Sequence, residues 1–506
     1  MRTNRSLRRL TVLLAMLLGL SLSLAACGGS GGAGAQSVVL NVGATTEPTG
    51  MDPAVDTGAG TPFVLLYNVY ETLVRIDEKG EIKPLLARSW SVSSDGSVYT
   101  FKLEPNATFA SGKPVNAEAV IASFERTRSG ENTTEVLKRQ MSRIKEMRAI
   151  DDHTVEVALN GPSQRWLYDI TSTAGIIYDL SSGQNLSEQP AGSGPYTFSR
   201  HDVGSMVSLV RNKNYWGTGP RVDEVNFRYY ADANAMVAAM LSGQLDIVSN
   251  LTVPQSVGQF SDTSRFKVLE GTTNGEVVLG FNHGNQALSN LKVRQAINHA
   301  IDRRAVLDSA WGGKGTLIGS MVPPTDPWYE DLSNTYPYDP AKAKQLLEEA
   351  GYANGLTLRM RVPTLPYAPP IAKLVAAQLR EVGIEVNVEE LDFSTWLSQV
   401  YTQRDYDMTV VAHVEPWDLP QFANPNYYWQ YNNPQFAELI NKADGAATSE
   451  EQEAILKQAA KMLADDAAAD WLFLLPNLVV TTTEISGITT NTTGLSFDMT
   501  HVATSR

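Results

Sequence analysis

The chain has little of the chemistry that catalytic and metal-binding motifs require. Cysteine occurs once, as Cys27, so no internal disulfide and no cysteine pair for zinc can form. The six histidines are scattered, without the spacing that places two metal ligands on one helix face. No His-Glu-x-x-His sequence and no P-loop is present. We therefore expect no catalytic residue, no metal site and no cofactor.

One short sequence fits the pattern of a serine nucleophile. Residues 28–32 read Gly-Gly-Ser-Gly-Gly, which matches G-x-S-x-G. This segment is rich in glycine, with no strand before it and no helix after it, so the strained turn of a nucleophile elbow is not expected there. A secreted hydrolase is the alternative from another functional class, and the sequence does not favour it.

Long apolar runs and an excess of basic residues are also missing. The longest apolar run of the later sequence, 471–475, is followed by Pro476, and we interpret it as a buried strand that ends there. Lysine and arginine total 41 against 55 acidic residues, a net charge of −14. Nucleic acids and anionic membrane surfaces bind clustered lysine and arginine. Both are therefore disfavoured as partners, and the acidic surface favours solubility.

The first residues have the pattern of an export signal. An uncharged run from Leu10 follows four arginines, and at about 15 residues it is shorter than the ~20 that span a membrane. It ends in Leu-Ala-Ala before Cys27, which resembles the bacterial lipobox, whose cysteine receives diacylglycerol. The alternative is an ordinary signal peptide with a chance cysteine. We expect a signal peptide over 1–26, lipidation of Cys27 and a flexible Gly/Ser/Ala tether over 27–36. Loss of the four arginines would change the net charge to −18.

The rest of the chain mixes helix and strand patterns. Helices are predicted over 62–73, 116–126, 340–350 and 371–382, with Asn116 as an N-cap and glycines 351 and 383 as stops. Strands are predicted over 38–42, 155–159 and 384–388, and a hairpin over 89–103. About 480 residues follow residue 26, enough for roughly three domain-sized units. The helix–glycine–strand order predicts an α/β fold.

Several short segments occur in the order seen in one known family. They include 109–115 (FASGKPV), 192–196 (GSGPY), 211–216 (RNKNYW), 242–246 (SGQLD) and 293–297 (VRQAI). Further ones are 51–53, 70–74, 84–90, 95–96, 99–103, 300–303 and 338–344. Together they resemble the family 5 extracellular solute-binding proteins of bacterial ABC importers for dipeptides, oligopeptides and nickel. Most of these segments have the pattern of tight turns or contain aromatic residues expected to pack in the core. They therefore indicate the fold more than the ligand.

The resemblance implies a periplasmic-binding-protein-like type II fold (cluster C), with two lobes, a hinge and an inserted third domain. The first lobe would use 37–70, 190–270 and 480–506. The inserted domain would be 71–189, and the second lobe 271–479. The hinge would lie near Gly271 and near 476–480.

The resemblance also implies a carboxylate in the second lobe that pairs with the amine of a bound peptide. In the family it usually follows a strand ending in Tyr-Asp, within Trp-x-x-Asp-Tyr. Here the strand is 406–411, and the next residues depart from the pattern, since His413 stands where tryptophan is expected. The acid is Glu415 or Asp418, with Trp417 between them, or both acids are surface residues of the loop.

Other ligand-contact candidates come from position in the family. The loop Gly58, Ala59, Gly60 and Thr61 precedes the first helix, and its glycines allow close approach of a ligand backbone. Thr272, Thr273 and Asn274 follow the expected hinge strand. Phe393 and Trp396 are candidates for side-chain pockets. The aromatic run 427–431 is either a pocket wall or core.

We therefore predict a monomeric, lipid-anchored receptor on the outer face of the cytoplasmic membrane or in the periplasm. It would bind a peptide or small solute and deliver it to ABC permease subunits driven by cytoplasmic ATPases. The alternative within the family is a nickel or other metal chelate, which His413 keeps open. A sensor lipoprotein that works without an importer is a third possibility.

Overall fold

The computed structural model describes residues 37–56 and 58–506. The segments predicted to be a signal peptide (1–26) and a tether (27–36, beginning with Cys27) lie outside the described residues. Residues Val39–Arg506 form one compact unit. Within the described part of the chain, no helix has both the length and the apolar character needed to cross a membrane.

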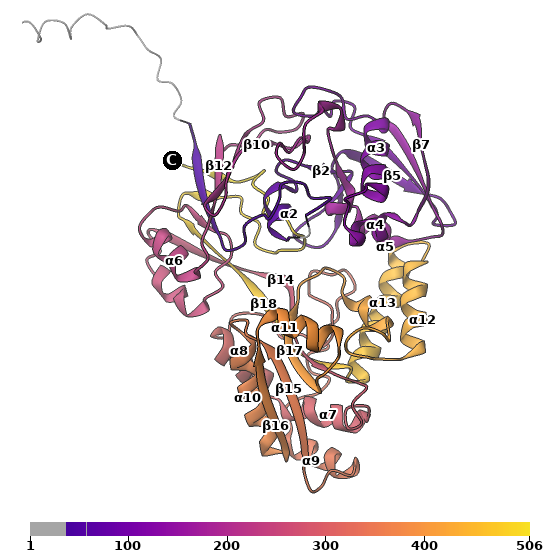
Figure 1. Ribbon diagram of the computed structural model, residues 1–506, viewed down its shortest axis with the longest axis vertical. Helices are drawn as coiled ribbons and strands as arrows, with labels where there is room; N and C mark the ends of the chain where they lie inside the picture. The colour runs from indigo at the N-terminus through magenta and orange to yellow at the C-terminus, as the bar shows by residue number, and fades with distance from the viewer. Residues whose placement is uncertain (1–36, 57) are drawn as a thin grey trace, which may run out of the picture. The chain divides into compact units, whose positions relative to one another are not determined.

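The largest element is a mixed sheet of ten strands in the order β10-β11-β12-β1-β13-β18-β14-β17-β15-β16. Its two long central strands, β14 (Phe266–Phe281) and β18 (Ala469–Thr482), run antiparallel and side by side (Figure 1). The other eight are β1 (Val39–Ala44), β10 (Tyr196–Asp202), β11 (Met206–Arg211), β12 (Glu224–Tyr229), β13 (Ile247–Val248), β15 (Leu356–Pro363), β16 (Ile384–Leu391) and β17 (Met408–His413).

Helices cover both faces of the β14–β17 part of this sheet (Figure 1). Val277 and Leu279 of β14 pack with α7 (Leu291–Ala300), α8 (Arg303–Trp311), α9 (Pro340–Glu349) and α10 (Ala368–Glu381). Val278, between them in sequence, points to the opposite face and packs with α11 (Phe393–Trp396), η4 (Leu397–Thr402), α12 (Pro434–Asp444) and α13 (Ser449–Asp465). Because successive side chains of a strand alternate between faces, a sheet covered on both sides needs the nearly continuous apolar sequence seen here.

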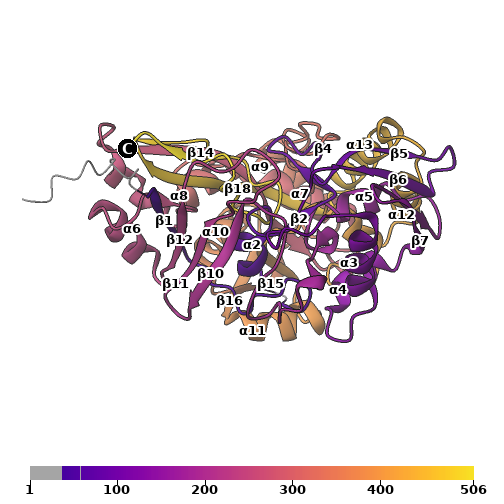
Figure 2. The same cartoon turned by 90° about the horizontal axis from the view of Figure 1, so that it is seen from above.

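A second sheet has four antiparallel strands in the order β5-β6-β8-β7. These are β5 (Ala87–Val92), β6 (Val98–Leu103), β7 (Ile144–Asp151) and β8 (Thr154–Leu159). They share a core with α3 (Ala117–Ser129), α4 (Glu135–Met141) and α5 (Gln164–Asp169) (Figure 2). This sheet falls within the segment 71–189 that the family resemblance implies to be an inserted domain. The domain boundaries themselves stay a prediction.

The remaining elements are short. The α-helices are α2 (Gly60–Leu65) and α6 (Ala233–Leu241). The 3₁₀ segments are η1 (Thr173–Gly175), η2 (Leu180–Ser182), η3 (Pro254–Phe260) and η5 (Leu419–Ala423). Three two-stranded pairs join β2 (Glu71–Thr72) to β9 (Ile176–Ile177), β3 (Val74–Ile76) to β4 (Ile82–Pro84), and β19 (Ile485–Ser486) to β20 (Ala503–Thr504).

Most local predictions are confirmed. The hairpin is β5–β6, and Asn116 caps α3 by accepting a 2.9 Å hydrogen bond from the backbone N–H of Ala119. Gly351 and Gly383 follow α9 and α10 with φ of 89° and 94°. A side chain at such a φ is strained, which explains why glycine stands at both helix ends.

Two local predictions are wrong. The helix expected over 62–73 ends at Leu65, because Tyr67 adopts φ 62° and its N–H donates to the carbonyl of Tyr70 at 2.7 Å. The strand expected to end before Pro476 continues to Thr482. Pro476 lies opposite Thr272, next to a register shift of the β14–β18 pair. At such an irregularity the missing N–H of proline is tolerated.

Candidate functional site

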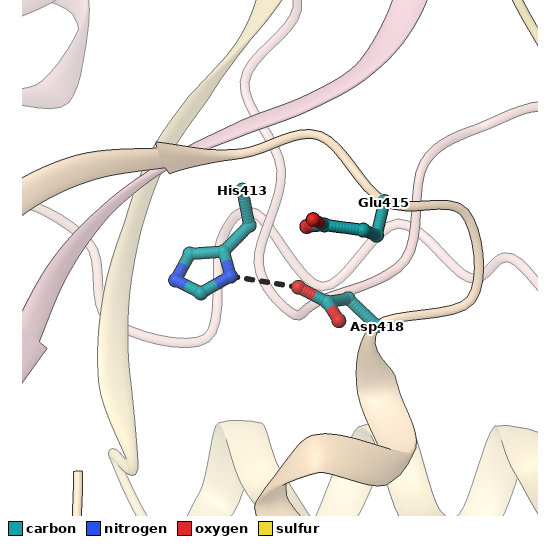
Figure 3. Close-up of side chains that lie close together, drawn as sticks. All are labelled: His413, Glu415 and Asp418. Atoms are coloured by element: carbon teal, nitrogen blue, oxygen red, sulfur yellow. Dashed lines mark hydrogen bonds and ion pairs between the residues drawn. The ribbon is translucent and has the colours of Figure 1, made fainter. Parts of the chain in front are cut away.

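The predicted carboxylates lie in the loop that follows β17. His413, the last residue of β17, is hydrogen-bonded through Nδ1 to Asp418 Oδ2 at 2.7 Å and through Nε2 to the Tyr428 hydroxyl at 2.9 Å. His413 and Asp418 are buried, whereas Glu415 is exposed. All three side chains point toward one another (Figure 3), and one ligand atom from each lies within 4.8 Å of the others. The loop therefore presents two carboxylates and one imidazole to a single point.

Trp417 of the same loop lies against residues distant in sequence. It adopts φ 60°, its ring stacks on Tyr168 of α5 at 4.2 Å, and the edge of Trp328 meets it at 4.4 Å. Arg165, also of α5, donates from Nη1 to the carbonyl of Trp417 at 3.0 Å. Its Nε donates to Asp169 Oδ1 at 2.9 Å. The loop after β17 is thus held by α5, whose sequence lies in the segment 71–189.

A second link joins the same two regions. Arg143 Nη1 and the Ser163 hydroxyl each donate a hydrogen bond of 2.7 Å to the carboxylate of Asp444, the last residue of α12. Figure 1 shows α12 reaching α5 at this point. Contacts of α5 with both α12 and the loop after β17 fix the position of Trp417.

The buried carboxyl of Glu276 is the most unusual group near this loop. Glu276 of β14 is the register partner of His413 on β17. Because the strands are antiparallel, Val278, two residues after Glu276, pairs with Val411, two residues before His413. Since Val278 and Val411 pack in one core cluster, Glu276 and His413 lie on that same face of the sheet. Glu276 is 1% exposed, and its Oε2 has no hydrogen-bond partner among the described residues.

Burial and surrounding acids dominate the electrostatics. Burial, together with the negative charge of Asp418, raises the pKa of Glu276 well above its usual range. Asp326 and Glu415 act on Glu276 in the same direction. Desolvation also raises the pKa of the half-buried Asp326 carboxyl to about 8, against a lowering effect of Arg165. The site therefore combines several carboxyls, and the pKa values of Glu276 and Asp326 are both raised.

The predicted pocket aromatics are joined to this site through Tyr428. Trp396 is buried, donates from Nε1 to the Thr409 hydroxyl at 3.0 Å, and meets Tyr428 edge to face at 6.0 Å. Phe393 is 45% exposed and stacks on Trp396 at 5.8 Å. Of the run 427–431, Tyr428, Trp429 and Tyr431 are buried core residues.

The segment Gly58–Thr61, expected to be a loop before the first helix, runs into the first turn of α2, since Gly60 and Thr61 are its first two residues. The Asp56 carboxylate accepts hydrogen bonds from the Gly58 N–H and the Thr61 hydroxyl. Gly60 is buried, and a Cβ there would lie 2.7 Å from the backbone of Glu47 and Pro48, so no larger residue fits. Ala59 is exposed. No hydrogen bond, ion pair or ring contact in the described part of the chain joins Gly58–Thr61 to His413, Glu415 or Asp418.

Thr272, Thr273 and Asn274 lie on β14 just before Glu276. Thr272 N–H donates to Asn491 Oδ1 at 3.0 Å, the Thr273 hydroxyl to the Leu475 carbonyl at 2.7 Å, and the Asn274 amide to the Thr493 carbonyl at 3.3 Å. These polar groups therefore fix β14 against β18 and residues 491–493. Their role as ligand contacts stays a prediction.

Three side chains at the site were not found from the sequence: Glu276, Asp326 and Arg165. Glu276 had a usable signal, since a lone acid opens the apolar run 277–281 of a buried strand. Arg165 and Asp326 had none, because Arg165 reaches the site through a contact distant in sequence and Asp326 acts on Glu276 electrostatically across 50 residues.

Comparison with known proteins gives a consistent result. Residues 81–475 match the model of the bacterial extracellular solute-binding proteins, family 5. Heme-binding protein A of Haemophilus influenzae is 28% identical over 458 residues, 81% of this chain and 82% of that protein. The dipeptide-binding protein of Escherichia coli is 25% identical over 384 residues, 70% of this chain and 72% of that protein.

The solved structures agree on the fold. An ABC transporter-associated periplasmic binding protein from Helicobacter pylori, in complex with the peptide STSA, superimposes with a TM-score of 0.74 at 25% identity. The match covers 92% of this chain and 98% of that one. The periplasmic-binding-protein-like α/β fold expected from the sequence is confirmed, and the chain belongs to family 5 of the bacterial extracellular solute-binding proteins.

Proposed function

We propose that this protein is the lipid-anchored solute-binding component of an ABC importer and that it captures dipeptides or oligopeptides. It binds the peptide between its two lobes and delivers it, as a monomer, to a permease pair driven by cytoplasmic ATPases. Membership of family 5 supports the importer role, because that family consists of extracytoplasmic substrate-binding proteins of transporters, which are not enzymes. The dipeptide-binding relative and the peptide complex of the Helicobacter protein support a peptide ligand.

One observation carries the choice of ligand. Asp418 is a buried carboxylate, 3% exposed, held in place by His413. A buried negative charge is costly unless a positive group or several donors compensate it. The terminal ammonium of a peptide supplies that charge. Glu415 is the weaker candidate for this role because it is exposed to water, which screens its interaction.

The direct test is native mass spectrometry of residues 37–506, purified without refolding, with release and identification of any bound molecule. A ladder of short peptides supports the proposal and gives the preferred length. A single mass of a metal with its chelator contradicts it. If the protein is purified empty, titration with a peptide library by calorimetry decides the question, and absence of any peptide binding contradicts the proposal.

A metal chelate is the second candidate. It is favoured by the grouping of His413, Glu415 and Asp418, whose donor atoms lie within 4.8 Å of one another. Both ring nitrogens of His413 are already hydrogen-bonded, to Asp418 and to Tyr428. Metal binding by His413 would displace one of these partners, so the geometry favours an ammonium ligand over a metal.

Replacing Cys27 by serine should release the protein from the membrane. A serine cannot form the thioether that carries the diacylglycerol, and the proposed attachment depends on that single thiol. Cell fractionation and detergent partitioning measure the result. Ser30→Ala, three residues further along the tether, is the matched control and should leave the protein with the membrane. Unchanged partitioning of Cys27→Ser would refute the lipid anchor.

A further inference from the structure

The carboxyl of Glu276 has no evident structural purpose. It faces the same side of the sheet as His413, its register partner on β17, and is 1% exposed. Its Oε2 has no hydrogen-bond partner within the part of the chain that the structure describes. A buried polar atom without a partner costs folding free energy, so a group that persists in this state is expected to meet its partner in another state of the protein.

Carboxyl groups outnumber the positive groups of the protein at this point. Glu276 interacts electrostatically with Asp418, Asp326 and Glu415, which makes four carboxyls in one region. Arg165 is the guanidinium that acts on Asp418 and Asp326, and it is already shared with Asp169 at 2.9 Å. His413 adds at most one positive charge. One ligand ammonium at Asp418 would still leave Glu276 Oε2 without a hydrogen-bond partner from the described residues.

The aromatic rings of the site are suited to a cation. The guanidinium of Arg165 lies 5.5 Å from the centre of the Trp417 ring and 5.8 Å from that of Tyr168. The faces of tryptophan and tyrosine attract cations through the ring quadrupole. These rings therefore already hold one positive group of the protein itself, beside the carboxyls that would receive a positive group of the ligand.

From these observations we propose that the site recognises a ligand with two cationic nitrogen groups, one paired with Asp418 and the other with Glu276. Under the peptide function proposed above, on which this reading rests, the second cation is the side chain of a lysine or arginine in the peptide. A free diamine offers the same chemistry. Burial and the neighbouring carboxyls raise the pKa of Glu276, and a ligand cation beside this carboxyl would act in the opposite direction.

Calorimetric titration of residues 37–506 with matched peptides of two to four residues tests the proposal. Each pair has lysine in one member and norleucine, which has the same carbon chain without the ammonium, in the other. Among the lysine peptides, the one with the highest affinity should bind at least about tenfold more tightly than the norleucine peptide paired with it. Glu276→Gln should reduce that ratio to near one. Glu270→Gln, on the exposed part of the same strand, should leave it unchanged.

Equal affinity for lysine and norleucine peptides would overturn this proposal and leave the peptide function standing. The same conclusion would follow if the lysine-to-norleucine affinity ratio were unchanged in Glu276→Gln. The wild-type comparison needs no variant, so it decides the question even if Glu276→Gln does not fold. If no peptide binds, the peptide function fails, and titration with putrescine against butylamine becomes the test. Tighter binding of putrescine, lost in Glu276→Gln, would uphold the two-cation site, and equal or absent binding would overturn it.

Discussion

Replacing Asp418 by asparagine should weaken peptide binding by about 3–5 kcal/mol, roughly two to four orders of magnitude in Kd. The substitution keeps the size and shape of the side chain and removes only its charge, so the hydrogen bond to His413 can persist. The bound ammonium then loses its partner in a buried environment, where Asp418 is 3% exposed. Isothermal titration calorimetry with the peptide identified by native mass spectrometry measures the change.

Glu415→Gln is the matched control for this prediction. Glu415 lies in the same loop and points toward the same place, but it is exposed (Figure 3). An exposed ion pair contributes about 0–1 kcal/mol, so the loss should be less than about tenfold in Kd. Near-wild-type affinity in both variants would remove the loop after β17 from the ammonium site. A large loss in Glu415→Gln alone would reverse the assignment of the two acids.

Local sequence signals were sufficient for most of the secondary structure. The cap at Asn116 and the stops at Gly351 and Gly383 depend on contacts within a few residues, so they could be predicted from a single sequence. The two errors depended on tertiary structure. Tyr67 turns the chain with a positive φ while its hydroxyl donates to the carbonyl of Thr171 at 2.6 Å, and Pro476 is accommodated by the strand opposite it.

The site was predictable only in part, for a similar reason. His413 and Asp418 lie five residues apart in one loop, so a pattern in the sequence could locate both. Glu276 meets that loop through the register between β14 and β17, which no local pattern specifies. Arg165 meets Trp417 across 252 residues of sequence. Long-range pairing therefore determined which charges surround the predicted acid, and that is where the sequence analysis was incomplete.

Replacing Glu276 by methionine should stabilise the empty protein while it abolishes the preference for a second cation. Methionine has a similar volume and no polar atom, and the neighbouring cluster of Val278, Trp396 and Trp429 is apolar. Removing the cost of an unpartnered buried carboxyl should raise the free energy of unfolding by about 1–3 kcal/mol near pH 8. Urea unfolding of residues 37–506 measures it. Glu270→Met, at an exposed position, should show no such gain.

The gain should depend on pH in a defined direction. Burial raises the pKa of Glu276 above the value of 4.5 that applies in the unfolded chain, so the folded protein keeps a proton that the unfolded chain releases. In the wild type, the contribution of this group to stability therefore falls as pH rises above about 4.5. Glu276→Met should thus exceed the wild type by more at pH 8 than at pH 4. A variant less stable than the wild type at both pH values would show instead that Glu276 stabilises the fold. The Glu276 carboxyl would then have a structural role in the empty protein. A ligand cation would no longer be needed to explain why an acid is buried at this position.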